Sequence, residues 1–384
     1  MAEIEFCHFR PKLDLKSFRE HLPVPVKMLN FPMDNAWPEL LQFGLRLEGP
    51  DVSEVGMTWL GSLAGMQVLR AFKSQELRDI RRQGTFVEIP WENCQYEDQV
   101  LGVPWHLDTR LFYYRRDIFE KAGIDASSAF ASPAKFKETL LHLKASGYEY
   151  PWVVSTKGNV LQYIAPWVWG YGGSFRSNDG HQIALTEPET MQGLRDYLEV
   201  IRLLKPDVPS KRDEELNTDF VNGNVPITYN GDWLYRDVLL YRPEFAEVLG
   251  AAKVPGAPYV GTMYLSIWRY SIYEEECLAL IRYLTDKATV QEAFERYRLI
   301  PPLTEILFSE FFTRDQVFKT IAESIRHGRT FKNNYRWAGV ESRLNSVFNQ
   351  LMSDLLTKPG LDLAGELHTR MHGIKLKLER TILA

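Results

Sequence analysis

Short apolar runs alternate with stretches of helical periodicity along the first part of the chain. The strand-like runs are Ile4–Phe9, Val26–Phe31, Val52–Thr58 and Leu111–Tyr114. Amphipathic stretches such as Trp37–Leu47 separate them. Strands that alternate with amphipathic helices form a sheet with helices on its faces, so the pattern predicts an α/β fold.

Helical periodicity dominates the remainder of the chain. Helices are predicted over Phe136–Ala145 and over Glu187–Leu204, the second capped by Thr186 with Pro188 in its first turn. Further periodic segments follow Arg314, namely Gln316–His327, Val340–Leu356 and Leu363–Arg380. The sequence therefore predicts a helical C-terminus.

Composition excludes several classes of protein. The 384 residues are 45% hydrophobic and 13% aromatic, enough to bury a sizeable core in two or three domains. The formal charge of −5 comes without a basic stripe, which argues against a nucleic-acid partner. No run of about 18 apolar residues occurs, so we expect no membrane insertion.

Cysteine and histidine usage gives no support for a metal site or a cofactor. Cys7, Cys94 and Cys277 lie far apart and lack metal-ligand spacing, so we expect free and mostly buried thiols. The eight histidines are scattered. We expect neither a metal nor a cofactor.

The segment Leu101–Lys121 is the most informative stretch. It predicts a Pro-Trp turn, an aromatic strand and then a helix that begins at Asp117. It also resembles the lobe-crossing segment of the family 1 extracellular solute-binding proteins of bacterial ABC importers, which commonly read G-V-P-x-x-x-D-T-x-x-x-Y-Y-x-x-D. Other segments resemble motifs of this maltose- and oligosaccharide-binding-protein-like family in the same order: Glu48–Trp59, Gly170–Met191, Phe220–Trp233 and Leu280–Pro302.

The resemblance implies a two-lobed periplasmic-binding-protein fold, type II-like, with lobes joined by hinge crossings. The lobes would comprise residues 1–107 with 262–308, and 108–261 with 309–384. The hinge would be formed by the crossings near Trp105–Asp108, Pro258–Gly261 and Pro301–Leu303. A few residues at such crossings can absorb the bend between two lobes.

A small ligand would then be captured in the cleft between the lobes by hinge closure and delivered to an ABC permease. Abundant aromatics at turns favour a carbohydrate, a di- or oligosaccharide, because sugars offer C–H patches to flat rings. Their hydroxyls also need polar partners, since a buried hydroxyl without one costs about 1 to 3 kcal/mol. A glycerol-phosphate binder is the weaker alternative, because only Arg298, Arg10 and Arg110 could supply a basic pocket.

Candidate ligand-binding residues fall at turns that match cleft positions of the family. They are Trp233, Trp169, Asp232, Trp59, Asp108, Trp167, Tyr171, Gly172, Tyr264, Arg298, Trp37, Phe9 and Arg10. Trp233 and Trp169 adjoin glycines that let a ligand approach the backbone, and we expect both rings to stack on the ligand. Asp232 is expected to accept a sugar hydroxyl.

Two of these candidates have open alternatives. Asp108 fits a hydrogen bond to the ligand and a turn or hinge-capping role equally well. Arg298 fits a bidentate contact to the ligand or a surface ion pair.

Met1–Leu15 lacks the apolar core of a secretory signal. We expect a monomeric periplasmic or extracellular, lipid-anchored protein whose signal has been removed. The alternative is a cytoplasmic or fused ligand-sensing domain of a regulatory protein with the same fold, which would report closure to a sensor partner.

An enzyme is the remaining rival. Glycoside hydrolysis requires a pair of carboxylates, and no such pair stands out in the sequence. The motifs G-x-S-x-G and H-E-x-x-H and a phosphate-binding loop are absent. We therefore expect a binding protein without catalytic residues.

Overall fold

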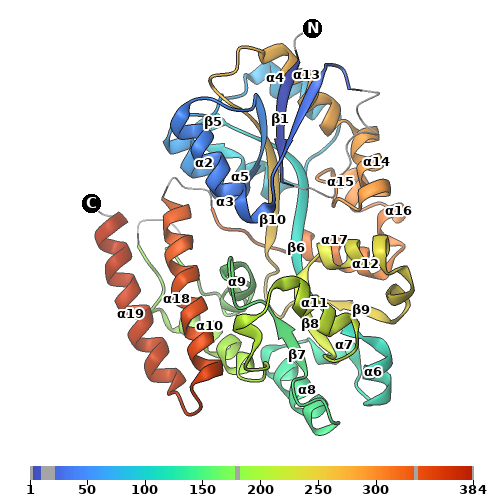
Figure 1. Ribbon diagram of the computed structural model, residues 1–384, viewed down its shortest axis with the longest axis vertical. Coiled ribbons are helices and arrows are strands. Elements are labelled where there is room, and N and C mark those ends of the chain that lie inside the picture. Colours follow the sequence, from blue (N-terminus) through green and yellow to red (C-terminus); the bar gives the residue numbers. More distant parts are fainter. Residues whose placement is uncertain (1–2, 10–21, 178–181, 333–335, 383–384) are drawn as a thin grey trace. The chain divides into compact units, whose positions relative to one another are not determined.

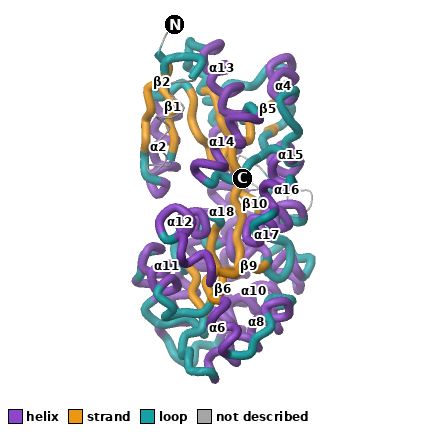
Figure 2. Tube along the Cα trace, turned by 90° about the vertical axis from the view of Figure 1, so that its right-hand side faces the viewer, coloured by secondary structure: helices purple, strands orange, loops and turns teal. Residues whose placement is uncertain are grey.

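The computed structural model describes residues 3–9, 22–177, 182–332 and 336–382 (Figure 1). Within these ranges strands alternate with helices, which confirms the predicted α/β class. Figure 2 shows that helices flank the strands. No helix among the described residues is long and apolar enough to cross a membrane.

Contacts within the chain divide it into two units. Unit 1 comprises Met1–Asp108, Val260–Arg314 and Thr330–Ala338, and unit 2 comprises Thr109–Tyr259, Asp315–Arg329 and Gly339–Ala384. The segment Thr330–Ala338, which the sequence assigned to lobe two, makes its contacts in unit 1.

The sheet of unit 1 has the strand order β2-β1-β3-β10-β6. These strands are β1 (Ile4–His8), β2 (Val26–Asn30), β3 (Val52–Gly56), β10 (Val260–Ile267) and the first half of β6 (Val103–Arg115). β1 is parallel to β2 and to β3, and β10 is antiparallel to β3. A small hairpin of β4 (Gln95–Tyr96) and β5 (Gln99–Val100) lies apart from this sheet.

Helices cover this sheet with apolar faces. They are α2 (Ala36–Arg46), α3 (Met57–Gly65), α4 (Ser74–Arg81), α5 (Glu88–Asn93), α13 (Glu274–Thr285), α14 (Lys287–Tyr297), α15 (Thr304–Leu307) and α16 (Glu310–Thr313). Phe6, Val52 and Leu265 of the strands share one core cluster with Ile281 of α13. Each of these side chains is fully buried, and burial of one such side chain stabilises a fold by about 1.5 to 3 kcal/mol.

The sheet of unit 2 is smaller and rich in aromatics. The second half of β6 pairs antiparallel with β8 (Ile227–Gly231) and with β9 (Leu249–Ala252), and β8 pairs in parallel with β7 (Trp152–Val154). The ring of Phe112 on β6 lies 4.3 Å from Phe136 and 4.7 Å from Tyr229. Aromatic pairs of this kind contribute about 0.5 to 1.5 kcal/mol beyond their buried area.

The helices of unit 2 make up most of its mass. They are α6 (Arg116–Lys121), α7 (Ala126–Ala129), α8 (Pro133–Ala145), α9 (Leu161–Gly170), α10 (Pro188–Ile201), α11 (Asp213–Val221), α12 (Trp233–Tyr241), α17 (Gln316–Arg326), α18 (Trp337–Thr357, from Gly339 onward) and α19 (Leu363–Ile382). The long helices α18 and α19 confirm the predicted helical C-terminus. Short 3₁₀ turns occur at Met33–Asn35, Val208–Ser210 and Pro243–Val248.

Two local predictions were wrong for identifiable reasons. The expected turn at Pro104-Trp105 is part of the continuous strand β6. In unit 1 this stretch is an edge strand, where a proline without an N–H is tolerated. The cap of α10 is Glu187, while the Thr186 hydroxyl accepts a hydrogen bond from Lys375 Nζ at 3.1 Å.

The three cysteines are free and buried, as expected. Burial raises the pKa of the Cys94 thiol to about 12, so it stays protonated at neutral pH. Cys277 belongs to the hydrophobic core cluster of unit 1.

Candidate functional site

Trp233 is the first residue of α12 and is separated from the end of β8 at Gly231 by Asp232 alone. Its ring lies against Gly231, where the β-carbon of any other residue would overlap the indole. The side chain remains half-buried. A glycine at the end of the strand therefore fixes the orientation of the tryptophan after it.

Arg110 of β6 covers part of the Trp233 ring. Its guanidinium carbon lies 4.5 Å from the ring centre of Trp233 and 5.5 Å from those of Tyr163 and Tyr259. Arg110 also donates a hydrogen bond to the side-chain oxygen of Gln162 and is only 5% exposed. A guanidinium among aromatic rings is held by cation–π attraction.

The series of planar groups continues from Tyr259. Trp169, on α9, stacks on Tyr259 with ring centres 6.5 Å apart and an angle of 16° between the planes. The guanidinium carbon of Arg329 lies 5.2 Å from the ring centre of Trp169. Because Trp169 is only 6% exposed, little of its ring is available for the stacking that the sequence suggested.

Asp232 ties the end of β8 to β6. Its Oδ1 accepts a hydrogen bond from the backbone N–H of Thr109 at 3.2 Å, and it is 7% exposed. The Thr109 hydroxyl donates to the carbonyl of Tyr259 at 2.7 Å. The position of Asp232 is thus set by backbone contacts beside Trp233.

Tyr113 contacts the same end of β8 through its hydroxyl group. Its hydroxyl donates to the carbonyl of Gly231 at 3.2 Å. Burial and the nearby charge of Asp232 raise the pKa of Tyr113 well above its ordinary value. The hydroxyl therefore stays protonated and acts as a donor at any physiological pH.

Unit 1 contains a pair of stacked tryptophans. Trp59 of α3 and Trp37 of α2 stack with ring centres 6.1 Å apart and an angle of 30°. Both side chains are half-buried. A β-carbon at Gly56 would lie 2.7 Å from Trp59 Cε3, so this ring also depends on a glycine that ends a strand.

A buried carboxylate lies under the end of β1. Glu54 Oε2 accepts a hydrogen bond from the backbone N–H of Phe9 at 2.6 Å, and Oε1 lies 3.4 Å from His106 Nε2. Glu54 and His106 are almost fully buried, and the Phe9 ring is 1% exposed. Phe9 thus packs in unit 1, and Arg10 lies outside the described residues.

Three further candidates of unit 1, Asp108, Tyr264 and Arg298, each have a different local environment. Asp108 is half-buried, with its carboxylate packed against the α-carbon side of Gly261. Tyr264 is fully buried, and its hydroxyl donates to the Pro90 carbonyl at 2.8 Å. Arg298 ends α14 in a left-handed conformation (φ 55°), with its guanidinium 5.6 Å from the ring of Phe294.

Three candidates of unit 2 lie away from Trp233. Trp167 is completely buried, packed edge-on against Tyr197 at 5.5 Å, and belongs to the core. Tyr171 is exposed and donates its hydroxyl hydrogen to Asp196 of α10. Gly172 forms an open turn with φ 80° and no atom near its would-be β-carbon.

The sequence did not indicate Tyr163, Gln162, Tyr259 or Arg329, and it named Arg110 only as a possible phosphate contact. One signal was available for Arg110. An arginine inside an otherwise aromatic strand must find partners for its charge, and aromatic faces and an amide supply them here.

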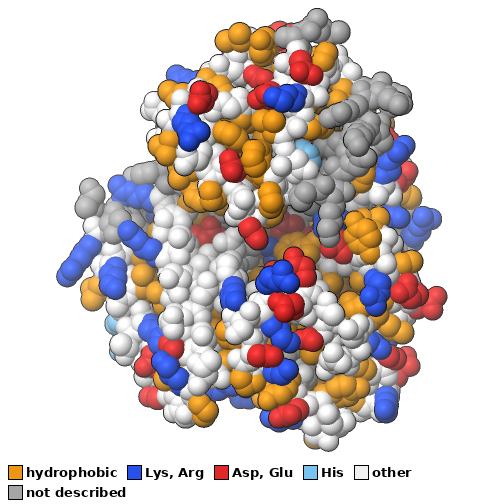
Figure 3. Space-filling model, viewed as in Figure 1, with side chains coloured by type: hydrophobic (Ala, Val, Ile, Leu, Met, Phe, Trp, Pro, Cys, Tyr) orange, Lys and Arg blue, Asp and Glu red, His pale blue; other side chains and the backbone are white. Residues whose placement is uncertain are grey.

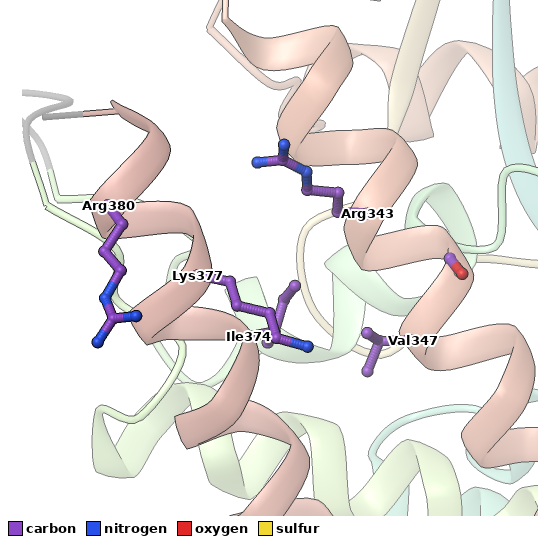
Figure 4. Close-up of a pocket in the computed structure, with 6 residues that line it drawn as sticks. Arg343, Val347, Ile374, Lys377 and Arg380 are labelled. Atoms are coloured by element: carbon purple, nitrogen blue, oxygen red, sulfur yellow. The ribbon is translucent and has the colours of Figure 1, made fainter. Parts of the chain in front are cut away.

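A groove of about 540 Å³ lies between α18 and α19 (Figure 4). Its walls carry Arg343, Lys377 and Arg380 around Val347 and Ile374. Figure 3 shows the face on which basic side chains lie over α19. Among the described residues, those that line this groove include no aromatic ring and no carboxylate.

The described residues do not form a metal-binding site. No group of three or more histidine, cysteine, aspartate or glutamate side chains is placed there to hold a metal ion.

Comparison with known families decides the class of the protein. The model of the bacterial extracellular solute-binding protein family matches residues 41–291, more than half of the chain. The chain belongs to this family. Members of the family are extracellular binding proteins.

Two curated relatives illustrate the degree of similarity. A probable ABC transporter-binding protein of Deinococcus radiodurans is 22% identical over 64% of this chain and 60% of its own length. A maltotriose-binding protein of Pyrococcus abyssi is 19% identical over 78% of this chain and 66% of its own length. The chain therefore spans less than two thirds of the length of these relatives.

Solved structures of solute-binding proteins share the fold over the full chain. One from Thermotoga lettingae, bound with α-D-tagatose, has a TM-score of 0.86 at 17% identity and covers 100% of both chains. The GacH receptor of Streptomyces glaucescens, solved with and without acarbose, has a TM-score of 0.83 at 18% identity and covers 99% of both chains. At these identities the likeness establishes the two-lobed fold.

Proposed function

We propose that this solute-binding protein captures a carbohydrate, a di- or oligosaccharide, between its two units and delivers it to an ABC importer. Proteins of the same fold bind tagatose, acarbose and maltose. A relative in sequence is named a maltotriose-binding protein. We propose that this chain binds the same class of ligand, a carbohydrate.

The observation that carries the proposal is the presence of one glycine-supported tryptophan in each unit. Trp59 follows the strand end at Gly56, and Trp233 follows the strand end at Gly231. Both rings are half-buried, so each keeps a surface for the C–H patches of a sugar. Strand ends are where α/β folds place their ligands.

Polar groups for the hydroxyls accompany each ring. In unit 2 the proposed acceptor is Asp232, beside Trp233. In unit 1 Asp108 serves as an acceptor in this proposal. Charge-assisted hydrogen bonds of this kind hold hydroxyls more strongly than neutral ones.

Closure of the two units on the ligand is the proposed mechanism. A ligand that contacts both units only when they are closed shifts the equilibrium toward the closed state by its differential affinity. The chain passes between the units after Asp108 and after Tyr259, within or beside β6 and β10. A few residues there absorb the bend, and the permease recognises the closed form.

The proposal also covers the oligomeric state and location of the protein and the fate of its ligand. The protein acts as a monomer, outside the cytoplasm and anchored by a lipid. It releases its ligand unchanged, since binding and not catalysis is the task of the family.

A thermal-shift panel tests this function. The probes are maltose, maltotriose, acarbose, tagatose and mannitol, because a ligand that binds only the native state raises the melting temperature. Small-angle X-ray scattering with the best probe then measures closure as a smaller radius of gyration. A melting-temperature rise without any change in scattering would contradict the hinge mechanism, and no rise with any sugar would contradict the ligand class.

A further inference from the structure

Arg329 is held in place by its backbone and by Trp169. Its backbone N–H donates to the carbonyl of Pro258 at 2.8 Å, and it forms a bridge with Tyr259. Its guanidinium lies over the Trp169 ring at 5.2 Å. The side chain is thus fixed at both ends beside the rings of the candidate site.

The charge of Arg329 has no acidic partner in the part of the chain that the structure describes. Arg329 retains exposed surface, yet partial burial lowers the pKa of its guanidinium. A stacked guanidinium presents its N–H groups in a plane, which matches the two oxygens of a carboxylate or phosphate.

Arg329 is connected to the proposed sugar contacts through a continuous series of planar groups. The order is Trp233, Arg110, Tyr259, Trp169 and Arg329, with neighbouring separations of 4.5, 5.5, 6.5 and 5.2 Å. Tyr259 and Arg329 are also residues at which the chain leaves unit 2. Arg329 therefore belongs to the same series of planar groups as the proposed sugar contacts of unit 2.

We propose that the ligand is an acidic carbohydrate, whose carboxylate or phosphate group is bound by Arg329 stacked on Trp169. This rests on the proposed function and narrows its substrate class. A neutral sugar would leave the stacked cation unused, whereas an acidic residue of an oligosaccharide pairs with it while another sugar ring contacts Trp233.

The test compares matched sugars that differ only in the acidic group. Calorimetric titrations use glucose against glucuronate, galactose against galacturonate, α-1,4-galactobiose against digalacturonate, and glucose against glucose 6-phosphate for the phosphate arm. We expect at least one acidic sugar to bind about 10-fold to 100-fold more tightly than its neutral counterpart, the range expected for hydrogen bonds to a charged group. This preference should shrink as salt is raised, because salt screens exposed charges.

Arg329→Gln removes the charge and keeps a side chain of similar reach. It should abolish the preference, so that the acidic sugar binds no more tightly than its neutral counterpart. Arg326→Gln, three residues earlier on α17, alters the net charge equally and should keep the preference.

The outcomes separate this inference from the proposed function. Neutral sugars that bind as tightly as acidic ones, with no effect of Arg329→Gln, overturn the acidic-ligand inference and leave the sugar-binding function standing. A preference that Arg329→Gln and Arg326→Gln reduce equally also overturns it, because the effect is then one of net charge. Failure of every probe, neutral or acidic, contradicts the function itself.

Discussion

The guanidinium carbon of Arg110 lies 4.5 Å from the ring centre of Trp233, although the two residues are far apart in sequence. Antiparallel pairing explains the contact, because Arg110 on β6 is in register with Gly231 on β8, two residues before the tryptophan. The cation holds one part of the ring, so in the proposed function Trp233 would meet a ligand in a fixed orientation. Such preorganisation lowers the entropic cost of binding.

Trp233→Ala should abolish or strongly weaken sugar binding and leave the fold intact. The ring is half-buried at the start of α12, so its loss removes a ligand surface and little of the core. Fluorescence titration measures binding, and far-UV circular dichroism measures folding. Normal affinity in this variant would show that the ring does not contact the ligand.

Gly231→Ala should weaken binding through Trp233 alone. A β-carbon at this position overlaps the indole, so the ring must move. Gly373→Ala is the matched control, because nothing lies near its β-carbon in α19. The control should gain about 0.5 to 1 kcal/mol of stability from the better helix former and bind normally. Equal affinity in the two variants would count against a fixed Trp233.

Trp167→Ala should destabilise the protein by about 3 to 5 kcal/mol, the usual cost of deleting a large core aromatic. The Trp167 ring is completely buried beside Phe112 and Tyr197. Urea unfolding gives the free energy of unfolding, with Trp233→Ala as the half-buried comparison. A loss below about 1 kcal/mol would contradict the core assignment of Trp167.

Asp354→Asn should reduce stability in a pH-dependent way. Hydrogen bonds from Lys358 and Arg370 lower the pKa of Asp354 from 3.8 to about 2. Since the folded-state pKa is the lower one, the contribution is complete above about pH 4 and disappears as the pH falls toward 2.

Urea unfolding at pH 7 and at pH 3 measures this dependence. At pH 7 the variant should be about 1 to 3 kcal/mol less stable than the parent protein, as expected for hydrogen bonds to a charged group. The difference should narrow at pH 3. A difference that is constant over this range would mean that the charge of Asp354 contributes nothing.

The fold could be predicted well from sequence because its signals are local and repeated. The alternating strands and helices and the long C-terminal helices are present in the structure, and the family model matches residues 41–291. The misplaced turn at Pro104 shows the limit, since an edge strand tolerates a proline that a central strand would not.

The candidate site was harder to predict because its contacts join distant segments. Trp167 and Trp169 are two residues apart on one helix, yet one packs in the aromatic core and the other lies between Tyr259 and Arg329. The sequence listed both as candidates and favoured Trp169 only because glycines follow it. Only the direction of each side chain on α9 separates them, and tertiary packing sets that direction.

Calorimetric titration of Trp59→Ala tests the central claim, that both units share one sugar, most directly. The titrant is the sugar that gives the largest thermal shift with the parent protein. We predict an affinity at least about 10-fold weaker, a loss of about 1.4 kcal/mol, because the unit 1 ring no longer contacts the ligand. An unchanged affinity would show that unit 2 binds the ligand alone and would contradict the account.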